Sequence, residues 1–78
     1  MSKIEKLLSK FKNAPQSLSY REVKKILQYL GFTHRQAKGS HEVFYKDQLF
    51  LTFAVHNGDT KPSYKTSALT SLQKNNLI

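Results

Sequence analysis

The chain of 78 residues has no cysteine, few acidic residues and no long apolar run. Without cysteine it can form neither a disulfide nor a thiolate metal site. No stretch approaches the roughly 20 apolar residues of a membrane-spanning helix, and the N-terminal segment MSKIEKLLSKFKN lacks the apolar core of a signal peptide. We therefore expect a cytoplasmic protein that does not enter a membrane and forms one small domain over residues 1–78.

Acidic residues number only 5, against 13 lysines and arginines, so the net charge is +8. The acids are scattered, which argues against a paired-carboxylate hydrolase and against a magnesium site. The three histidines, His34, His41 and His56, have spacings that match no common zinc motif. The sequence thus indicates no metal and no other cofactor, while its positive charge favours a nucleic acid or an acidic protein as partner.

A short helix is expected at the N-terminus. Ser2 and Glu5 have the spacing of a capping box, and residues 2–12 carry one apolar face. Pro15 then interrupts the helical pattern, because proline biases the preceding residue away from helical backbone. Residues 1–17 are therefore expected to form an extra helix and a linker before a core that spans residues 18–78.

The core begins with a second helix, which the capping box of Ser19 with Glu22 starts and Gly31 ends. Three strands are expected next, then a loop and a last helix from Ser63. Short turns force neighbouring strands to pair antiparallel, and the helices can cover one face of the sheet. The order α-α-β-β-β-α predicts an α+β two-layer sandwich with a three-stranded antiparallel sheet. The expected strands are residues 32–38, 41–46 and 49–55, and the loop is 56–62.

The stretch KGSHEVF, residues 38–44, places His41 at the start of a strand, directly after a turn at Gly39 and Ser40. A core histidine needs no such setting. Imidazole can accept or release a proton near neutral pH, so an exposed ring here can take the proton from a ribose 2′-OH. That oxygen then attacks the adjacent phosphate, and the reaction needs no metal. The alternative is an ordinary surface histidine in a turn.

Basic side chains are candidates for phosphate contacts, because lysine and arginine hold the nucleic-acid backbone. Each of them can equally be an ordinary solvated residue. Aromatic residues of the expected strands can stack on bases, although in so small a domain they more often belong to the core. The basic candidates are Arg35, Lys38, Lys46, Lys61 and Lys65, and the aromatic ones are Phe44, Tyr45 and Phe50.

The capped segment LSYREVKKILQYLGF, the step KGSHEVF and the strand that ends in VHNG together resemble the HicA toxins. These are small mRNA interferases of bacterial and archaeal toxin–antitoxin pairs. The likeness covers residues 18 to about 74, and its specific element is the Gly-Ser-His step after a basic residue. It implies a fold like a double-stranded-RNA-binding domain, with helices on one face of the three-stranded sheet.

The resemblance also implies roles for single residues. His41 matches the catalytic histidine of that family, Gly39 and Ser40 match the residues before it, and Lys38 matches the basic position. The family's antitoxin, HicB, covers the active site and often binds DNA itself. The stretch VHNGDTKPSYKTSAL lacks the proline that many members carry directly before a histidine, so we assign no role to His56.

Our first hypothesis is therefore a toxin that cleaves mRNA as a metal-independent endoribonuclease with a single catalytic histidine, His41. A cognate HicB-like antitoxin would inhibit it, and DNA would be reached only through that antitoxin. Lys38, His34 or water are the candidates for a second proton-transfer group. The alternatives are a non-catalytic RNA-binding module of the same fold and a small DNA-binding adaptor, for which no recognition helix is visible.

Overall fold

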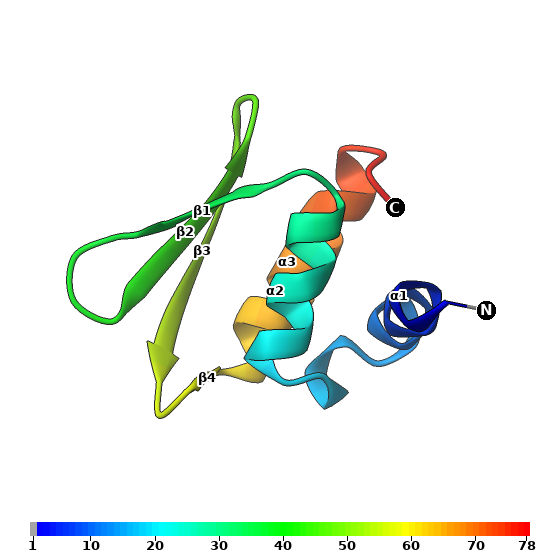
Figure 1. Ribbon diagram of the computed structural model, residues 1–78, viewed down its shortest axis with the longest axis horizontal. Helices are drawn as coiled ribbons and strands as arrows, with labels where there is room; N and C mark the ends of the chain where they lie inside the picture. Colours follow the sequence, from blue (N-terminus) through cyan, green and yellow to red (C-terminus); the bar gives the residue numbers. More distant parts are fainter. Residues whose placement is uncertain (1) are drawn as a thin grey trace.

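The computed structural model describes residues 2–78, so only the first residue of the expected domain lies outside it. Over residues 2–78, three α-helices and a 3₁₀ turn accompany an antiparallel sheet of four strands in the order β1-β2-β3-β4 (Figure 1), which confirms the α+β class. Within residues 2–78 no helix is both long and apolar enough to cross a membrane. The elements are α1 (Lys3–Asn13), η1 (Pro15–Ser17), α2 (Tyr20–Tyr29), β1 (Thr33–Gln36), β2 (His41–Lys46), β3 (Leu49–His56), β4 (Asp59–Thr60) and α3 (Pro62–Lys74).

The fourth strand corrects the predicted order. Residues 56–62 are expected to form a loop, yet Asp59–Thr60 pair with the last two residues of β3. The reversal uses Asn57 and Gly58, whose φ angles are 53° and 79°. Two successive left-handed residues match the twist of a tight hairpin, and Asn-Gly is the pair that adopts them most readily. The observed order is therefore α-α-β-β-β-β-α, and the likeness to a double-stranded-RNA-binding domain remains a prediction.

The expected boundaries of α2 are confirmed. The Glu22 N–H donates to Ser19 Oγ at 3.2 Å and the Ser19 N–H donates to Glu22 Oε1 at 2.9 Å, which completes the capping box. After the helix, Gly31 has a φ of 96°, where a side chain would be strained. The Phe32 N–H then reaches back to the Leu27 carbonyl at 2.9 Å, so the chain leaves α2 at a defined angle towards β1.

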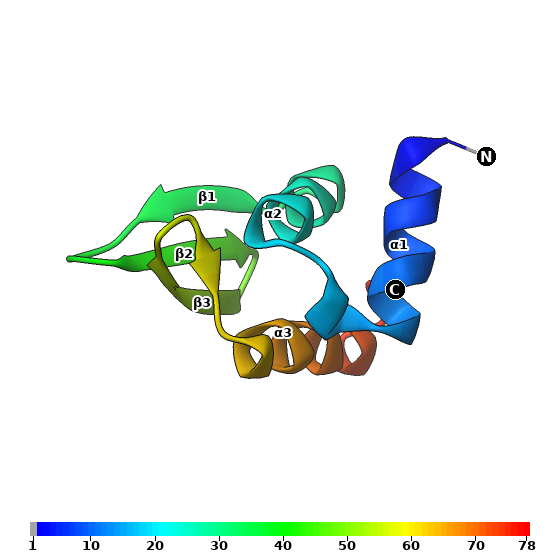
Figure 2. The same ribbon diagram turned by 90° about the horizontal axis from the view of Figure 1, so that it is seen from below.

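The helices lie in two layers on one side of the sheet. In both views α2 and α3 lie between the sheet and α1 (Figures 1 and 2). Phe11 of α1 is fully buried, so α1 completes the core on the side of α2 and α3 that faces away from the sheet. The largest fully buried side chains are Phe11, Leu18, Val23, Ile26, Leu27, Phe44, Phe53 and Leu72.

The two faces of the sheet differ because successive strand residues point to opposite sides. Phe44, Leu51 and Phe53 are buried against the helices and mark the covered face. The other face, called the open face below, is not covered by any helix of the described residues (Figure 2). By strand register its residues are Thr33 and Arg35 in β1, Ala37 directly after β1, and His41, Val43, Tyr45, Phe50, Thr52, Ala54 and His56 in β2 and β3.

Candidate active site

The turn between β1 and β2 holds the backbone of His41 in place. Gly39 has a φ of 69°, a conformation that favours glycine. The Ala37 N–H donates to the His41 carbonyl at 2.9 Å, and the Val55 N–H donates to the Ser40 carbonyl at 2.9 Å. Both neighbouring strands therefore secure the chain at the start of β2, and the imidazole projects from a defined position.

The side chains around His41 on the open face leave its ring uncovered. Directly across are Ala37, the residue after β1, and Ala54 on β3, which each offer a single methyl group. The diagonal neighbours, which lie within reach of long side chains, include Arg35 on β1 and His56 on β3. All three of Arg35, His41 and His56 are exposed. The open face thus presents an accessible imidazole between a guanidinium and a second imidazole.

Two further predicted phosphate-contacting residues lie at the same end of the sheet as His41. Lys38 is exposed in the turn directly before β2. Lys61 is exposed between β4 and α3, and β4 pairs with the end of β3 that lies beside His41. The structure therefore brings Arg35, Lys38 and Lys61 to the end of the molecule that carries His41.

The remaining two predicted phosphate-contacting lysines are engaged inside the protein. Lys46, at the far end of β2, lies on the covered face, where its Nζ donates to the Leu30 carbonyl at 2.8 Å. Lys65 is only 4% exposed, and its Nζ lies 3.2 Å from Asp59 Oδ1. Because both amines already have partners within the fold, neither enters the RNA contacts proposed below.

His34 lies on the covered face, so the sheet separates it from His41. Its ring stacks on Phe44 with centroids 4.7 Å apart, and its Nε2 lies 2.6 Å from Glu42 Oε1. The Tyr20 hydroxyl donates to the same carboxylate oxygen at 2.6 Å. This network was not predicted from the sequence. It ties β1 and β2 to α2, and its central residue, Glu42, directly follows His41 in β2. Strand alternation could have shown that residue 42 faces the helices.

The network shifts the pKa values of its members. Burial raises the pKa of Tyr20, and the hydrogen bond to Glu42 and its negative charge raise it further. Burial alone would raise the pKa of Glu42, but the hydrogen bonds from Tyr20 and His34 outweigh it and hold the pKa below its ordinary value. Glu42 is therefore ionised in the folded protein at neutral pH.

Because the pKa of Glu42 is lower in the folded than in the unfolded chain, its contribution to stability is present above the unfolded value of about 4.3. That contribution is lost as the pH falls through the folded pKa. We expect Glu42→Gln to lower the free energy of unfolding at pH 7 by roughly 1.5–3 kcal/mol, the range for hydrogen bonds to charged groups. Urea denaturation at pH 7 and at low pH measures the effect.

The matched control for this prediction is Glu5→Gln, which changes an exposed carboxylate of α1. We expect it to unfold like the wild type at both pH values. The wild type should lose more stability on acidification than Glu42→Gln does. An equal loss in the two proteins would show that the Tyr20–Glu42–His34 network contributes nothing to the pH dependence.

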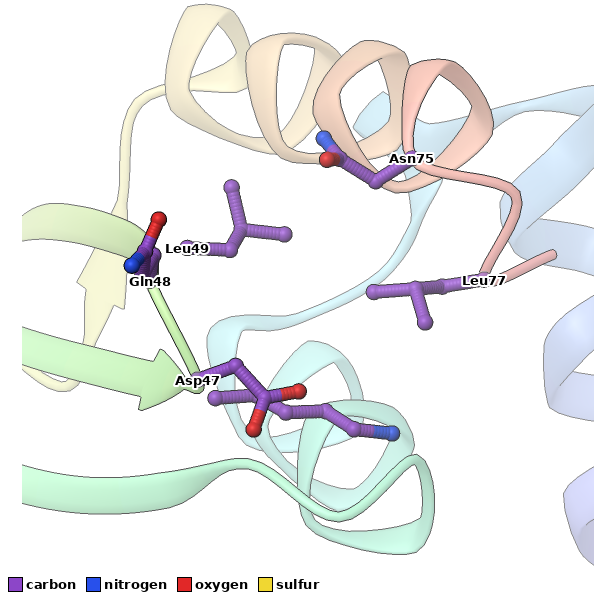
Figure 3. A pocket seen from close by; sticks show the side chains of 6 residues that line it. Asp47, Gln48, Leu49, Asn75 and Leu77 are labelled. Atoms are coloured by element: carbon purple, nitrogen blue, oxygen red, sulfur yellow. The ribbon is translucent and has the colours of Figure 1, made fainter.

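A hollow lies at the opposite end of β2 from His41 (Figure 3). It separates the β2–β3 hairpin from the end of α3, and Asp47, Leu49, Asn75 and Leu77 are among its lining residues. None of the predicted site residues except Lys46 borders it. We therefore assign the hollow no part in the chemistry of His41.

Comparison with known proteins gives one match. The family model described as "HicA toxin of bacterial toxin-antitoxin" matches residues 20–73. A search of curated proteins and a search of solved structures found no match. The matched segment contains α2, all four strands, the turn before His41 and all but the last residue of α3, whereas α1 and η1 precede it. With most of its length matched, the chain belongs to the HicA toxin family, and it is the toxin of a toxin–antitoxin pair whose partner is a cognate antitoxin.

Proposed function

We propose that this toxin is a metal-independent endoribonuclease that cleaves mRNA, with His41 as its single catalytic histidine. The observation that carries the proposal is the uncovered ring of His41 on the open face. Two alanines lie opposite the ring, and Arg35 lies diagonal to it. An imidazole that served the core would have the buried contacts that His34 makes on the covered face.

The proposed reaction begins when the neutral imidazole of His41 takes the proton from a ribose 2′-OH. The 2′ oxygen forms a bond to the adjacent phosphorus while the bond from phosphorus to the 5′ oxygen breaks. The products are a 2′,3′-cyclic phosphate and a 5′-OH, whose oxygen takes up a proton from a second group, either water or Lys38. Proton transfer by one side chain contributes roughly 10²–10⁴-fold to the rate. DNA lacks the attacking hydroxyl and is not a substrate.

Positive charge around His41 supports the same reaction. Arg35 and Lys38 are placed to hold the phosphate and to stabilise the charge that develops on it, and Lys61 is placed to hold the chain further along. The place of His34 on the covered face argues against it as the second proton-transfer group. Water and Lys38 remain the candidates for that role.

Cleavage of RNA by the purified toxin, with and without EDTA, tests the proposal. We expect equal cleavage under both conditions. Loss of cleavage in EDTA would show that the reaction needs a metal ion. Binding of RNA without any cleavage would instead establish the non-catalytic RNA-binding module of the same fold.

We further propose that the cognate antitoxin is a HicB-like acidic protein that covers the open face around His41. Opposite charges steer association, and screening by salt weakens the steering. We expect the association rate to fall by about tenfold or more between low and physiological ionic strength. Stopped-flow mixing of the antitoxin with the toxin measures this rate.

Charge variants localise the effect. Lys38→Gln, beside His41, should flatten the salt dependence of the association rate. Lys12→Gln, which is exposed on α1 and removes the same charge, should leave the salt dependence nearly as it is in the wild type. An association rate that does not change with salt would contradict electrostatic docking.

A further inference from the structure

Within residues 2–78 two large apolar side chains are exposed, Tyr29 of α2 at 60% and Phe50 of β3 at 62%. Phe50 lies on the open face, directly opposite Tyr45 of β2. The two rings form a tilted pair with centroids 6.0 Å apart and an interplanar angle of 34°. Tyr45 is half-buried and supports the exposed ring of Phe50, so a planar ligand can stack on Phe50, and neither ring belongs to the hydrophobic core.

The aromatic pair shares its face with His41. Tyr45 is four residues from His41 along β2 on the same side, which corresponds to about 13 Å at the usual rise of a strand. The strand positions of this face, within residues 33–56, include Arg35 and no acidic residue. The open face is therefore a surface with the exposed ring of Phe50 at one end, the imidazole of His41 at the other and only positive formal charge between them.

We propose that the open face binds single-stranded RNA, with one base stacked on Phe50 while the ribose and phosphate to be cut lie at His41. The proposal rests on the endoribonuclease function and adds the class of its substrate. In a duplex each base is covered by its stacked neighbours, whereas a single strand can turn a base outward onto an aromatic ring. Phe50 then fixes how far the cut lies from the stacked base.

A tryptophan reporter tests the stacking directly. The chain contains no tryptophan, so Phe50→Trp introduces the protein's only indole at the proposed contact. Combined with His41→Ala to prevent cleavage, this variant should lose fluorescence when a single-stranded RNA oligonucleotide is added. A blunt duplex of the same sequence should leave the emission nearly unchanged.

The matched control is Tyr29→Trp in the same His41→Ala background. Tyr29 has almost the same exposure as Phe50 but lies on α2, away from the open face. Its variant should show no quenching with either RNA. Equal quenching in both variants, or quenching of Phe50→Trp by duplex as strongly as by single strand, would overturn the proposal.

Affinity gives a second measurement. We expect Phe50→Leu, which keeps apolar bulk but removes the ring, to weaken binding of the single-stranded oligonucleotide about ten- to a hundredfold. Tyr29→Leu should bind like the parent protein, and Phe50→Tyr should retain affinity. Unchanged single-strand affinity for Phe50→Leu would overturn the proposal. If Phe50→Leu lost antitoxin binding but kept its affinity for RNA, the proposal would also be overturned, and the Phe50 ring would belong to the interface with the antitoxin.

These binding measurements do not depend on catalysis. If the endoribonuclease function fails but the Phe50 effects hold, the open face binds single-stranded RNA without cutting it. If cleavage occurs but Phe50→Leu binds and cuts single-stranded RNA like the wild type, only the proposed base contact is wrong.

Discussion

His41→Ala should leave the toxin folded and able to bind RNA, while RNA cleavage falls by at least about 100-fold. The ring is exposed and faces two alanines, so its removal opens no cavity in the core. We expect a change in the free energy of unfolding of no more than about 1 kcal/mol, as for most surface substitutions. Arg35 and Lys38 remain in place and should keep the phosphate contacts.

Circular dichroism, an RNA-binding titration and a cleavage time course on one His41→Ala preparation measure the three parts of this result. An unfolded variant would make His41 a structural residue. A folded variant that cuts RNA at the wild-type rate would make the catalytic assignment wrong.

The other two histidines are the matched controls, and both alanine variants should retain more cleavage than His41→Ala. His34→Ala removes a partner of Glu42 on the covered face, so its effect should fall on stability. His56→Ala is the more stringent control, because His56 lies diagonal to His41 on the open face. A folded His56→Ala variant that is as inactive as His41→Ala would show that two histidines share the proton transfers.

Phe11→Ala should destabilise the toxin by about 3–5 kcal/mol, the usual cost of removing a buried phenylalanine ring. Phe11 is fully buried although α1 precedes the segment that the family model matches. A chain of this length has a total stability of roughly 4–12 kcal/mol, so the loss should unfold a large part of the population or shift the urea midpoint far down.

Lys12→Ala is the control for Phe11→Ala, since Lys12 is the next residue of α1 and is exposed. It should change the free energy of unfolding by no more than about 0.5 kcal/mol. Urea denaturation of both variants measures the difference. If Phe11→Ala were as stable as Lys12→Ala, α1 would be an appendage and not a part of the core.

Local signals in the sequence predicted most of the fold. The Ser19–Glu22 capping box and the glycine at position 31 define α2, because both act through backbone contacts within a few residues. β2 was predicted with its observed boundaries, His41–Lys46. β4 was missed although Asn57-Gly58 is a strong hairpin signal, because a strand of two residues has no hydrophobic periodicity of its own.

The candidate site was less predictable, because a basic residue in a sequence carries no sign of its partners. Alternation from His41 along β2 could have placed Lys46 on the covered face, where it binds the Leu30 carbonyl. The burial of Lys65 depends on Asp59, six residues away across the turn into α3, and no periodic pattern indicates that pair. That two alanines, Ala37 and Ala54, lie opposite His41 follows from the strand register, which the sequence alone does not give.

The central claim is that His41 takes a proton from a ribose 2′-OH, and the chemistry of the product ends tests it most directly. Mass spectrometry of a short RNA cut by the purified toxin in EDTA should find 2′,3′-cyclic phosphate and 5′-OH ends. The same RNA with a single 2′-deoxyribose at the cut position should stay intact at that bond. Ends with 3′-OH and 5′-phosphate, or cleavage beside the 2′-deoxyribose, would contradict the claim.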